Sequence, residues 1–244
     1  MELIIGCCGW GYFNASEVFG KDWKKKFRSK LQAYAKMFDS VEVNSTFYRL
    51  PKPETAEKWK TEAEEVNKSF VFTMKVNQEI THKLRFGDRS VEVFGRVREV
   101  GKRLGAKVLL FQTPASFKST DENIDKMKKF FDEVERDGFV FAWEPRGEWH
   151  KNKELIKEVC SELNLVECVD PLRNTPVWFG RERIAYFRLH GFGKPSMYSY
   201  KFSDEELRKI KGIVESLNVN KVYLFFNNVF MYDDAIRFKK IIEK

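Results

Sequence analysis

The strongest constraint in this sequence is an alternation of short apolar runs with amphipathic stretches, repeated along the whole chain. Eight runs are rich in β-branched and aromatic residues, at 3–7, 40–43, 70–75, 107–111, 138–143, 165–169, 184–189 and 221–226. Several are apolar almost throughout, which is typical of parallel strands covered on both faces. Strands that alternate with helices predict a parallel sheet, and eight is the number that closes a (β/α)8 barrel.

Helical periodicity occupies most of the intervals between these runs. Apolar residues recur at helical spacing within 27–38, 124–134 and 207–217. Ser203 and Glu206 have the spacing of a capping box at the start of the last of these stretches. Each of the three is therefore expected to form a helix packed against the sheet.

One crossover and three loops depart from the regular alternation. Residues 170–183 contain two prolines and no helical period, so we expect the sixth crossover to be irregular. The connections at 8–26, 76–89 and 190–202 are long and follow strands, which puts them at the carboxyl face of a barrel. We predict an α/β fold with a single TIM-like barrel domain over residues 1–244.

Composition restricts the class of protein further. No apolar run approaches the roughly 20 residues that cross a bilayer, and the opening MELIIGCCGWGY lacks the features of a signal peptide. We therefore expect a cytoplasmic protein with no membrane partner. The four cysteines form no CxxC pair, which favours reduced thiols. Lys and Arg number 44 against 36 Asp and Glu, and the net charge of +8 favours anionic ligands.

Polar residues stand at the ends of several predicted strands. Side chains alternate along a strand, so Glu42 and Asn44 point to the face opposite Val41 and Val43. The valines suit the helix layer, and the polar pair is expected to face the barrel axis. The same parity places polar residues at the ends of five further strands: Lys75, Gln112, Glu144, Arg188 with His190, and Asn227. We expect all of them to line one cavity at the carboxyl end of the barrel.

The expected cavity combines both signs of charge with an imidazole: Glu42, Glu144, Lys75, Arg146, Arg188 and His190. Charges packed in this way shift one another's pKa values, which suits general acid–base catalysis. We expect Glu144 or His190 to transfer the proton and Glu42 to orient a cation or the substrate. The alternative is an ion-pair network that only holds the barrel closed.

Aromatic residues cluster in the same predicted loops: Trp10, Tyr12, Tyr48, Trp149, Tyr198 and Tyr200. Such a set could stack a planar ligand, with simple packing as the alternative for each residue. Trp10 and Trp149 have the strongest positional case for ligand contact. His82 lies in a long loop, where it is expected either to bind a ligand or to be solvated.

A metal site is weakly indicated. Glu42, Glu144, Asp170 and His190 are suitable ligands at strand ends, but three histidines without HxH or HExxH spacing do not indicate a zinc cluster. A divalent metal is therefore not favoured, and the residues identify no cofactor. Cys8, at the end of the first strand, is either a nucleophile or an inert buried thiol.

Seven short blocks coincide with the predicted strand ends: GCCGW at 6–10, VEVNSTFYRLP at 41–51, FTMKVNQEITH at 72–82, LLFQTPASF at 109–117, WEPRGEW at 143–149, YFRLHG at 186–191 and YLFFNN at 223–228. In this order they resemble the signature blocks of the YecE-like barrel family, domain of unknown function 72. The resemblance implies a TIM-like barrel and supplies no reaction. The residues that match the family's blocks are Glu42, Asn44, Tyr48, Arg49, Lys75, His82, Gln112, Glu144, Arg146, Trp149, Arg188, His190 and Asn227.

Two positions depart from the family's pattern. The first block commonly has Ser where this chain has Cys8, so the resemblance implies no hydroxyl chemistry there. The block around Glu144 commonly continues Arg-His-Pro, whereas here Arg146 is followed by Gly147. A mechanism that uses that histidine is therefore not implied for this chain.

These observations favour an enzyme of hydrolase or lyase type. Its ligand would be a small anionic molecule, phosphorylated or derived from nucleic acid, held by Lys75, Arg146 and Arg188. The first alternative is a nucleotide- or nucleic-acid-binding module without turnover. The second is glycoside hydrolysis by Glu42 and Glu144, ranked last because the second and fifth strands lie far apart around a barrel. The sequence leaves the oligomeric state open.

Overall fold

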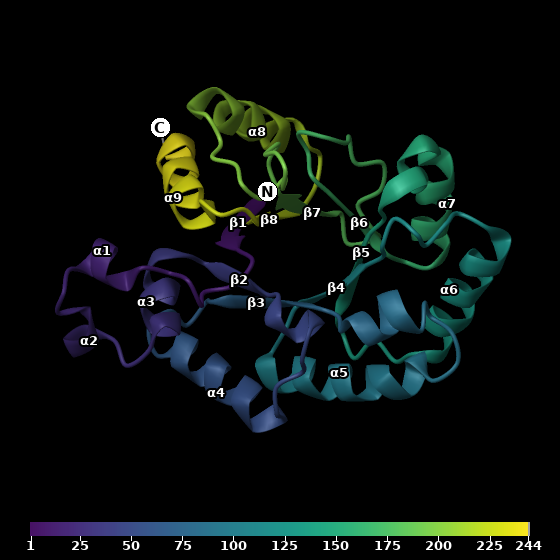
Figure 1. Cartoon of the computed structure of the whole chain (residues 1–244), viewed down its shortest axis with the longest axis horizontal. Helices are drawn as coiled ribbons and strands as arrows, with labels where there is room; N and C mark the ends of the chain where they lie inside the picture. Colours follow the sequence, from purple (N-terminus) through teal and green to yellow (C-terminus); the bar gives the residue numbers. More distant parts are fainter. Residues whose placement is uncertain (244) are drawn as a thin grey trace.

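Eight parallel strands close into a barrel in sequence order. The structure is a computed structural model that describes residues 1–243. Figure 1 shows the ring of strands with helices around it, and the strands are β1 (Glu2–Cys7), β2 (Ser40–Val43), β3 (Val71–Lys75), β4 (Val108–Gln112), β5 (Val140–Glu144), β6 (Val166–Val169), β7 (Ile184–Leu189) and β8 (Lys221–Phe226). Each strand pairs with the next, and β8 pairs in parallel with β1. The predicted TIM-like barrel is confirmed.

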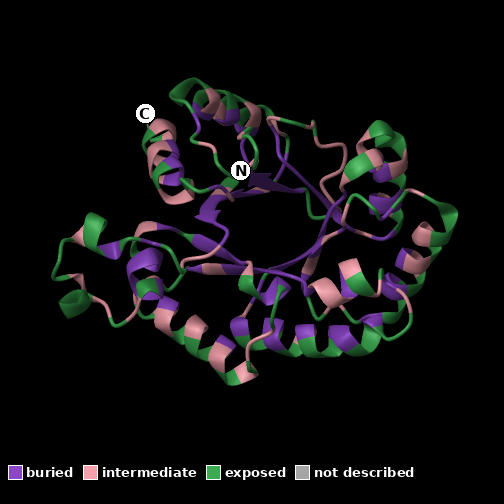
Figure 2. Cartoon of the chain, in the orientation of Figure 1, coloured by how far each residue is buried: buried purple, intermediate pink, exposed green. Residues whose placement is uncertain are grey.

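The helices form the outer layer. They are α1 (Ala15–Phe19), α2 (Trp23–Lys26), α3 (Lys30–Met37), η1 (Ser45–Phe47), α4 (Pro53–Glu64), η2 (Glu79–Lys83), α5 (Ser90–Leu104), α6 (Asp121–Glu133), η3 (Gly147–Lys151), α7 (Lys153–Glu162), α8 (Asp204–Ser216) and α9 (Met231–Ile242). In Figure 2 their buried residues face the strands and their exposed residues face outward. The capping box at Ser203 and Glu206 is present. The first predicted helix is shorter than its apolar pattern, because Ser29 caps α3 and leaves Phe27 outside it.

The sixth crossover has no helix between β6 and β7, as predicted. Glu167 faces this segment from β6, and its Oε2 accepts a hydrogen bond from the backbone N–H of Val177 at 2.6 Å. The N–H of Glu167 in turn donates to the carbonyl oxygen of Trp178 at 3.3 Å. An extended segment thus covers β6, with its backbone satisfied by Glu167 instead of by helical hydrogen bonds.

Two apolar layers lie on either side of the barrel wall. Val41 and Val43 pack outward with the helices, in the larger cluster of buried residues. Residues of opposite parity, among them Leu110, Ala142 and Tyr186, fill the barrel interior. The parity argument is therefore confirmed for these strands, and it aims each strand's last inward side chain at the carboxyl mouth.

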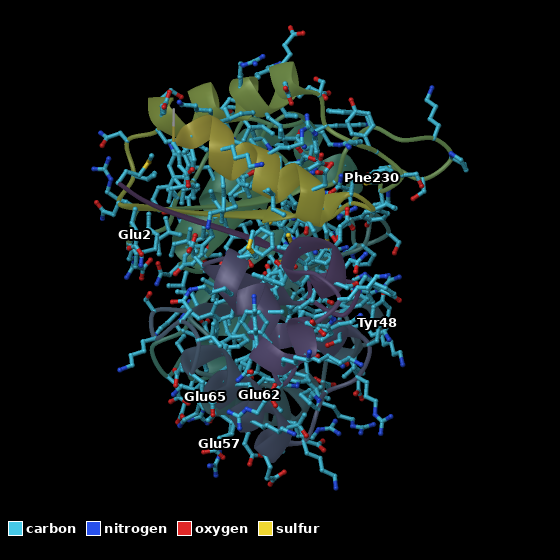
Figure 3. The ribbon with its side chains drawn as sticks, turned by 90° about the vertical axis from the view of Figure 1, so that its left-hand side faces the viewer. Glu2, Tyr48, Glu57, Glu62, Glu65 and Phe230 are labelled. Carbon is cyan, nitrogen blue, oxygen red and sulfur yellow. The ribbon has the colours of Figure 1, made fainter. Side chains whose placement is uncertain are left out.

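The carboxyl ends of the strands lie together on one side of the molecule. In Figure 3, Glu2 at the start of β1 lies at the left, whereas Tyr48 after β2 and Phe230 after β8 lie at the right. The four cysteines are buried free thiols. Within residues 1–243, no helix combines the length and apolar character needed to cross a membrane.

Candidate functional site

Arg188 is the centre of the mouth. It projects inward from β7, and its side chain is 1% exposed. Its Nη2 lies 2.9 Å from Oε1 of Glu42 on β2, and its Nη1 lies 2.6 Å from Oε2 of Glu144 on β5. One guanidinium therefore joins two carboxylates from opposite parts of the barrel. The two carboxylates are linked through Arg188, because its long side chain reaches both.

Glu42 lies beneath the mouth and not in it. Its side chain has no exposed surface. Oε2 accepts a hydrogen bond from the hydroxyl of Tyr186 at 2.8 Å, and Oε1 accepts one from the thiol of Cys8 at 3.1 Å. Burial, followed by the charge of Glu42, raises the pKa of the Cys8 thiol well above its usual range. Glu42 is thus placed to orient Arg188, and Cys8 is a protonated thiol instead of a nucleophile.

Glu144 is fully engaged by two arginines. Besides Arg188 on Oε2, Oε1 accepts hydrogen bonds from Nε and Nη2 of Arg146 at 2.9 and 2.6 Å. Burial alone would raise the pKa of Glu144, but Arg188 and Arg146 hold it well below its usual range. This environment does not support the expected role of Glu144 as the group that transfers a proton near neutral pH.

His190 lies between these arginines and Asp170. Its Nε2 is 3.2 Å from Nη2 of Arg146 and 3.5 Å from Nη1 of Arg188. Guanidinium nitrogens only donate, so Nε2 is the acceptor and the ring proton is on Nδ1. Nδ1 lies 3.7 Å from Oδ2 of Asp170, which also accepts the backbone N–H of His190 at 3.0 Å. Burial lowers the pKa of His190, which favours the neutral ring.

Lys75 has a different environment from the arginines. Its residue is 7% exposed, and its Nζ lies 3.8 Å from the centroid of the Phe47 ring. Within residues 1–243, its ammonium group makes no hydrogen bond or ion pair. Burial, together with the charge of Arg188, lowers the pKa of Lys75 to about 8. The mouth thus contains a buried amine without a counter-ion of its own.

The segment after β2 positions Phe47 under this amine. Thr46 Oγ1 lies 2.7 Å from the carbonyl oxygens of both Val43 and Lys75, which attaches η1 to the ends of β2 and β3. Asn44 precedes this turn, and its Oδ1 is buried with no hydrogen-bond partner among the described residues. Asn44 therefore has a buried amide oxygen without a partner in residues 1–243, directly after the end of β2.

His82 reaches the same region from η2. Its ring is half-buried and packs edge-on against Phe47, with centroids 4.9 Å apart, while Nδ1 lies 2.8 Å from the Thr81 hydroxyl. Burial, then the charges of Lys75 and Arg146, lowers the pKa of His82 to about 4. The sequence left open a ligand-binding or a solvated histidine, and the structure shows a half-buried ring that packs on Phe47 near the cations.

A cavity of about 190 Å³ opens beside Glu144 and His190. Of the strand-end residues expected to line one cavity, these two line it, whereas Glu42, Asn44, Lys75, Gln112, Arg188 and Asn227 do not. The expectation that all of them share this one cavity is therefore wrong. The cavity is lined in part by His150, Arg173 and Asn174, which the sequence did not single out, and by Asp170, which it named only as a possible metal ligand. Asp170 follows β6 with the inward parity of Cys168, so strand parity also directs it to the mouth. His150 lies in η3 and Arg173 in the crossover after β6, where strand parity gives no direction for a side chain.

The other predicted residues differ in their placement. Gln112 is the last residue of β4 and Asn227 follows β8; both are half-buried and have no side-chain hydrogen bond within the described part of the chain. Tyr48 is 71% exposed, and Arg49 beside it is also exposed. Gln112 and Asn227 thus have free polar groups, whereas Tyr48 and Arg49 belong to the outer rim.

The two tryptophans are packing residues in this structure. Trp149 is fully buried, its indole N–H donates to the carbonyl oxygen of Phe117 at 2.7 Å, and its ring meets Trp143 edge-on at 4.8 Å. Trp10 packs edge-on against Trp59 of α4 with centroids 5.1 Å apart. The expected ligand contact is not supported for Trp149, because no face of its ring is accessible. Trp10 is only half-buried, but one edge contact already holds it against the helix layer.

The metal ligands considered from the sequence have other partners. Glu42 and Glu144 bind arginines, and Asp170 accepts backbone N–H groups of His190 and Leu172. Among residues 1–243, no group of three or more His, Cys, Asp or Glu side chains is arranged to hold a metal ion. We therefore derive no chemistry here through a metal.

The fold and this site define a (β/α)8-barrel protein with a buried arginine–carboxylate network beneath a cationic mouth. The chain belongs to the DUF72 family, described as "Protein of unknown function DUF72", whose family model matches residues 4–243. UPF0759 protein YecE of Escherichia coli K12 is 36% identical over 98 residues, which cover 39% of this chain and 34% of that protein. The match thus spans about a third of the length of this curated relative.

Solved structures agree with the barrel fold. A DUF72 family protein from Thermotoga maritima superimposes with a TM-score of 0.76 at 23% identity, covering 100% of both chains. D-psicose 3-epimerase, crystallised in the presence of D-fructose, has a TM-score of 0.56 at 11% identity, covering 96% of this chain and 89% of its own. At these identities the likeness shows a shared fold and no shared reaction.

Proposed function

We propose that this protein is an enzyme of hydrolase or lyase type that binds a small anionic ligand at the carboxyl mouth of the barrel. Its ligand would carry a phosphate or carboxylate group. The observation that carries the proposal is the charge balance around Arg188. Arg188 and Arg146 offset Glu42 and Glu144, which leaves the charge of Lys75 without a counter-ion among the described residues.

An anion would be attracted to the two cations that face the mouth. Lys75 has no ionic partner within residues 1–243, and the Arg146 side chain is 23% exposed beside the cavity. His82 is affected by the charges of both, so the three groups lie near one another. Asn44, Gln112 and Asn227 add neutral polar groups around this position. Charged hydrogen bonds in so buried a mouth are stronger than in water.

His190 is the group best suited to accept a proton. Its Nδ1–H faces Asp170, an arrangement that orients an imidazole for general-base catalysis. In the free protein its Nε2 is covered by Arg146 at 3.2 Å. An anion that takes hydrogen bonds from Arg146 would free Nε2, so binding and base activation would be coupled in one step.

Calorimetric titration with inorganic phosphate tests the binding part. Arg146→Met should weaken phosphate binding by roughly tenfold to a hundredfold, since a hydrogen bond to a charged group contributes about 1.5–3 kcal/mol. Arg208→Met, on the exposed face of α8, is the matched control and should leave binding unchanged. Equal affinities for wild type and Arg146→Met would contradict an anion site at the mouth.

Turnover requires a separate test, because the alternative is a nucleotide- or nucleic-acid-binding module. We would assay phosphomonoesters, phosphodiesters and glycosides with and without divalent metal, using His190→Gln as the comparison. Saturable binding of one of these compounds, without formation of a product that is lost in His190→Gln, would favour the binding module. A steep loss of affinity with salt would then indicate a polymeric nucleic acid, and a flat response a small ligand.

Glycoside hydrolysis remains the least supported alternative. It requires one carboxyl group that is protonated and a second that acts as nucleophile or base. Glu144 is held ionised by its two arginines, and Glu42 has no exposed surface. Both carboxylates bind Arg188, so neither is free to meet a sugar.

A further inference from the structure

The environment of the Lys75 amine differs from that of the lysines in this chain that form ion pairs with carboxylates. Lys75 is buried and is the last residue of β3, at a position whose side chain is directed inward. Its Nζ lies 3.8 Å from the centroid of the Phe47 ring. By contrast Lys118 and Lys201 make exposed ion pairs at 3.1 and 2.6 Å. An amine held against an aromatic ring, without an acceptor in residues 1–243, keeps its nitrogen available to a ligand.

We propose that Lys75 is a nucleophile that forms a Schiff base with an aldehyde or ketone carrying a carboxylate or phosphate group. The inference rests on the proposed function, because the anionic group of the ligand would be held by Arg146 while its carbonyl meets Lys75. It narrows that function to lyase chemistry on carbonyl compounds. The stabilised iminium would serve as the electron sink for breaking an adjacent bond.

The step balances without an added reagent. The Lys75 ammonium first gives a proton to water. The Nζ lone pair of the neutral amine then forms a bond to the carbonyl carbon, the C=O π electrons move to oxygen, and that oxygen takes a proton from nitrogen to give a neutral carbinolamine. The hydroxyl group takes back the first proton and leaves as water while the nitrogen lone pair forms the C=N bond. The ammonium ion and the carbonyl compound thus become an iminium ion and one water, with the same total charge.

Three features of the surroundings of Lys75 suit this chemistry. Burial and the nearby Arg188 lower the pKa of Lys75 to about 8, so a useful fraction of the amine is neutral near pH 7 to 8. Phe47 stabilises a cation on its face and would continue to do so for the iminium. His82, whose pKa is lowered to about 4 by burial and by the charge of Lys75, is neutral at pH 7 and adds no opposing charge near the iminium.

Other titratable groups face Lys75 from the surrounding strands. Glu144 and Glu42 raise its pKa, as does Cys8, and these effects are smaller than burial and Arg188. Trapping should therefore become faster as the pH rises from about 6 and level off above about 8, where the neutral amine predominates.

Borohydride trapping tests the inference directly. Wild-type protein would be incubated with pyruvate or with dihydroxyacetone phosphate, reduced with sodium borohydride, and analysed by intact mass and peptide mapping. We expect a stable secondary amine on Lys75 with at least one of the two compounds. Comparison of the adduct yields of pyruvate and dihydroxyacetone phosphate decides whether the ligand carries a carboxylate or a phosphate. Dihydroxyacetone, which carries no anion, should give little or no adduct.

Matched variants separate nucleophilic from electrostatic roles. Lys75→Arg keeps the positive charge and should lose the adduct while still binding phosphate, whereas Lys75→Met should lose the adduct and weaken phosphate binding. Lys107→Met, at an exposed position just before β4 and at the opposite end of the barrel, should trap normally. Circular dichroism of each variant would show that it is folded.

The outcomes distinguish the two proposals. Saturable phosphate binding by wild type without any adduct on Lys75 would overturn the Schiff-base inference and leave the anion site standing. An adduct that persists in Lys75→Arg would also overturn it, because another amine would then be responsible. No binding of phosphate, pyruvate or dihydroxyacetone phosphate would overturn both.

Discussion

Nη1 of Arg188 donates to Oε2 of Glu144 at 2.6 Å, across the interior from β7 to β5, and both side chains are almost completely buried. Burying two charges is favourable only when their hydrogen bonds are well satisfied. Arg146 completes the bonding of Glu144, and Glu42 completes that of Arg188. A change in the charge of either side chain should therefore change both the stability of the barrel and the charge of its mouth.

Replacement of Glu144 by Gln should lower stability and preserve anion binding. The amide keeps the shape of the carboxylate, but its NH2 group would face a guanidinium donor, and one buried charge would lose its partner. Because removal of one member of a buried pair is strongly destabilising, we expect a loss of roughly 3–5 kcal/mol in the free energy of unfolding. Phosphate affinity should stay the same or increase, since the mouth becomes more cationic.

Urea denaturation and phosphate titration of Glu144→Gln measure both effects. Glu148→Gln is a suitable control, because Glu148 pairs with Lys118 at an exposed site and should change stability by less than about 1 kcal/mol. A large loss of stability combined with a total lack of phosphate binding in wild type and variant would mean that the ring is only a structural network.

Acidification should destabilise the protein through its neutral histidines. The pKa of His82 is about 4 when folded, below its usual value of 6.5, and that of His190 is also lowered. Between about pH 6.5 and 4 the histidines of the unfolded chain take up protons that those of the folded protein do not. The free energy of unfolding therefore falls as the pH decreases through this range. His82→Gln should reduce this slope.

Denaturation midpoints measured at several pH values in this window would check the effect. The variant and wild type should converge in slope above about pH 7, where the histidine is neutral in both states. An identical pH dependence for wild type and His82→Gln throughout the window would show that His82 titrates normally in the folded protein.

Trp149→Phe should affect stability and not ligand binding. The substitution removes the indole N–H and leaves the Phe117 carbonyl oxygen buried without its donor at 2.7 Å. An unsatisfied buried acceptor costs about 1–3 kcal/mol, so the free energy of unfolding should fall by that amount. Phosphate titration should be unchanged, and a selective loss of binding in a stable variant would contradict the packing role.

The four thiols should be unreactive in the folded protein. Cys7, Cys8, Cys160 and Cys168 are free and buried. A maleimide reagent should therefore label none of them under native conditions and all four after unfolding without reductant. Fewer than four labelled groups in the unfolded protein would indicate a disulfide, which the structure does not contain among these residues.

Much of the fold and part of the site were predictable from the chain alone. The runs at 184–189 and 221–226 coincide with β7 and β8, and the prolines in 170–183 correctly indicated a crossover without a helix. The alternation in VEVN correctly predicted that Glu42 points inward and Val41 outward. These are properties of neighbouring residues, and the steric and hydrophobic rules that produce them act locally.

The pairing of side chains was decided only by the tertiary structure. Strand parity brought Glu42, Glu144 and Arg188 to one mouth, but the reach of Arg188 to both carboxylates depends on the stagger of the strands and the width of the barrel. The same geometry left Lys75 against Phe47, with no counter-ion in residues 1–243, and enclosed Trp149 outside the barrel wall. A local pattern determines which side of a strand a residue faces, whereas its contacts across the barrel exist only when all eight strands have closed.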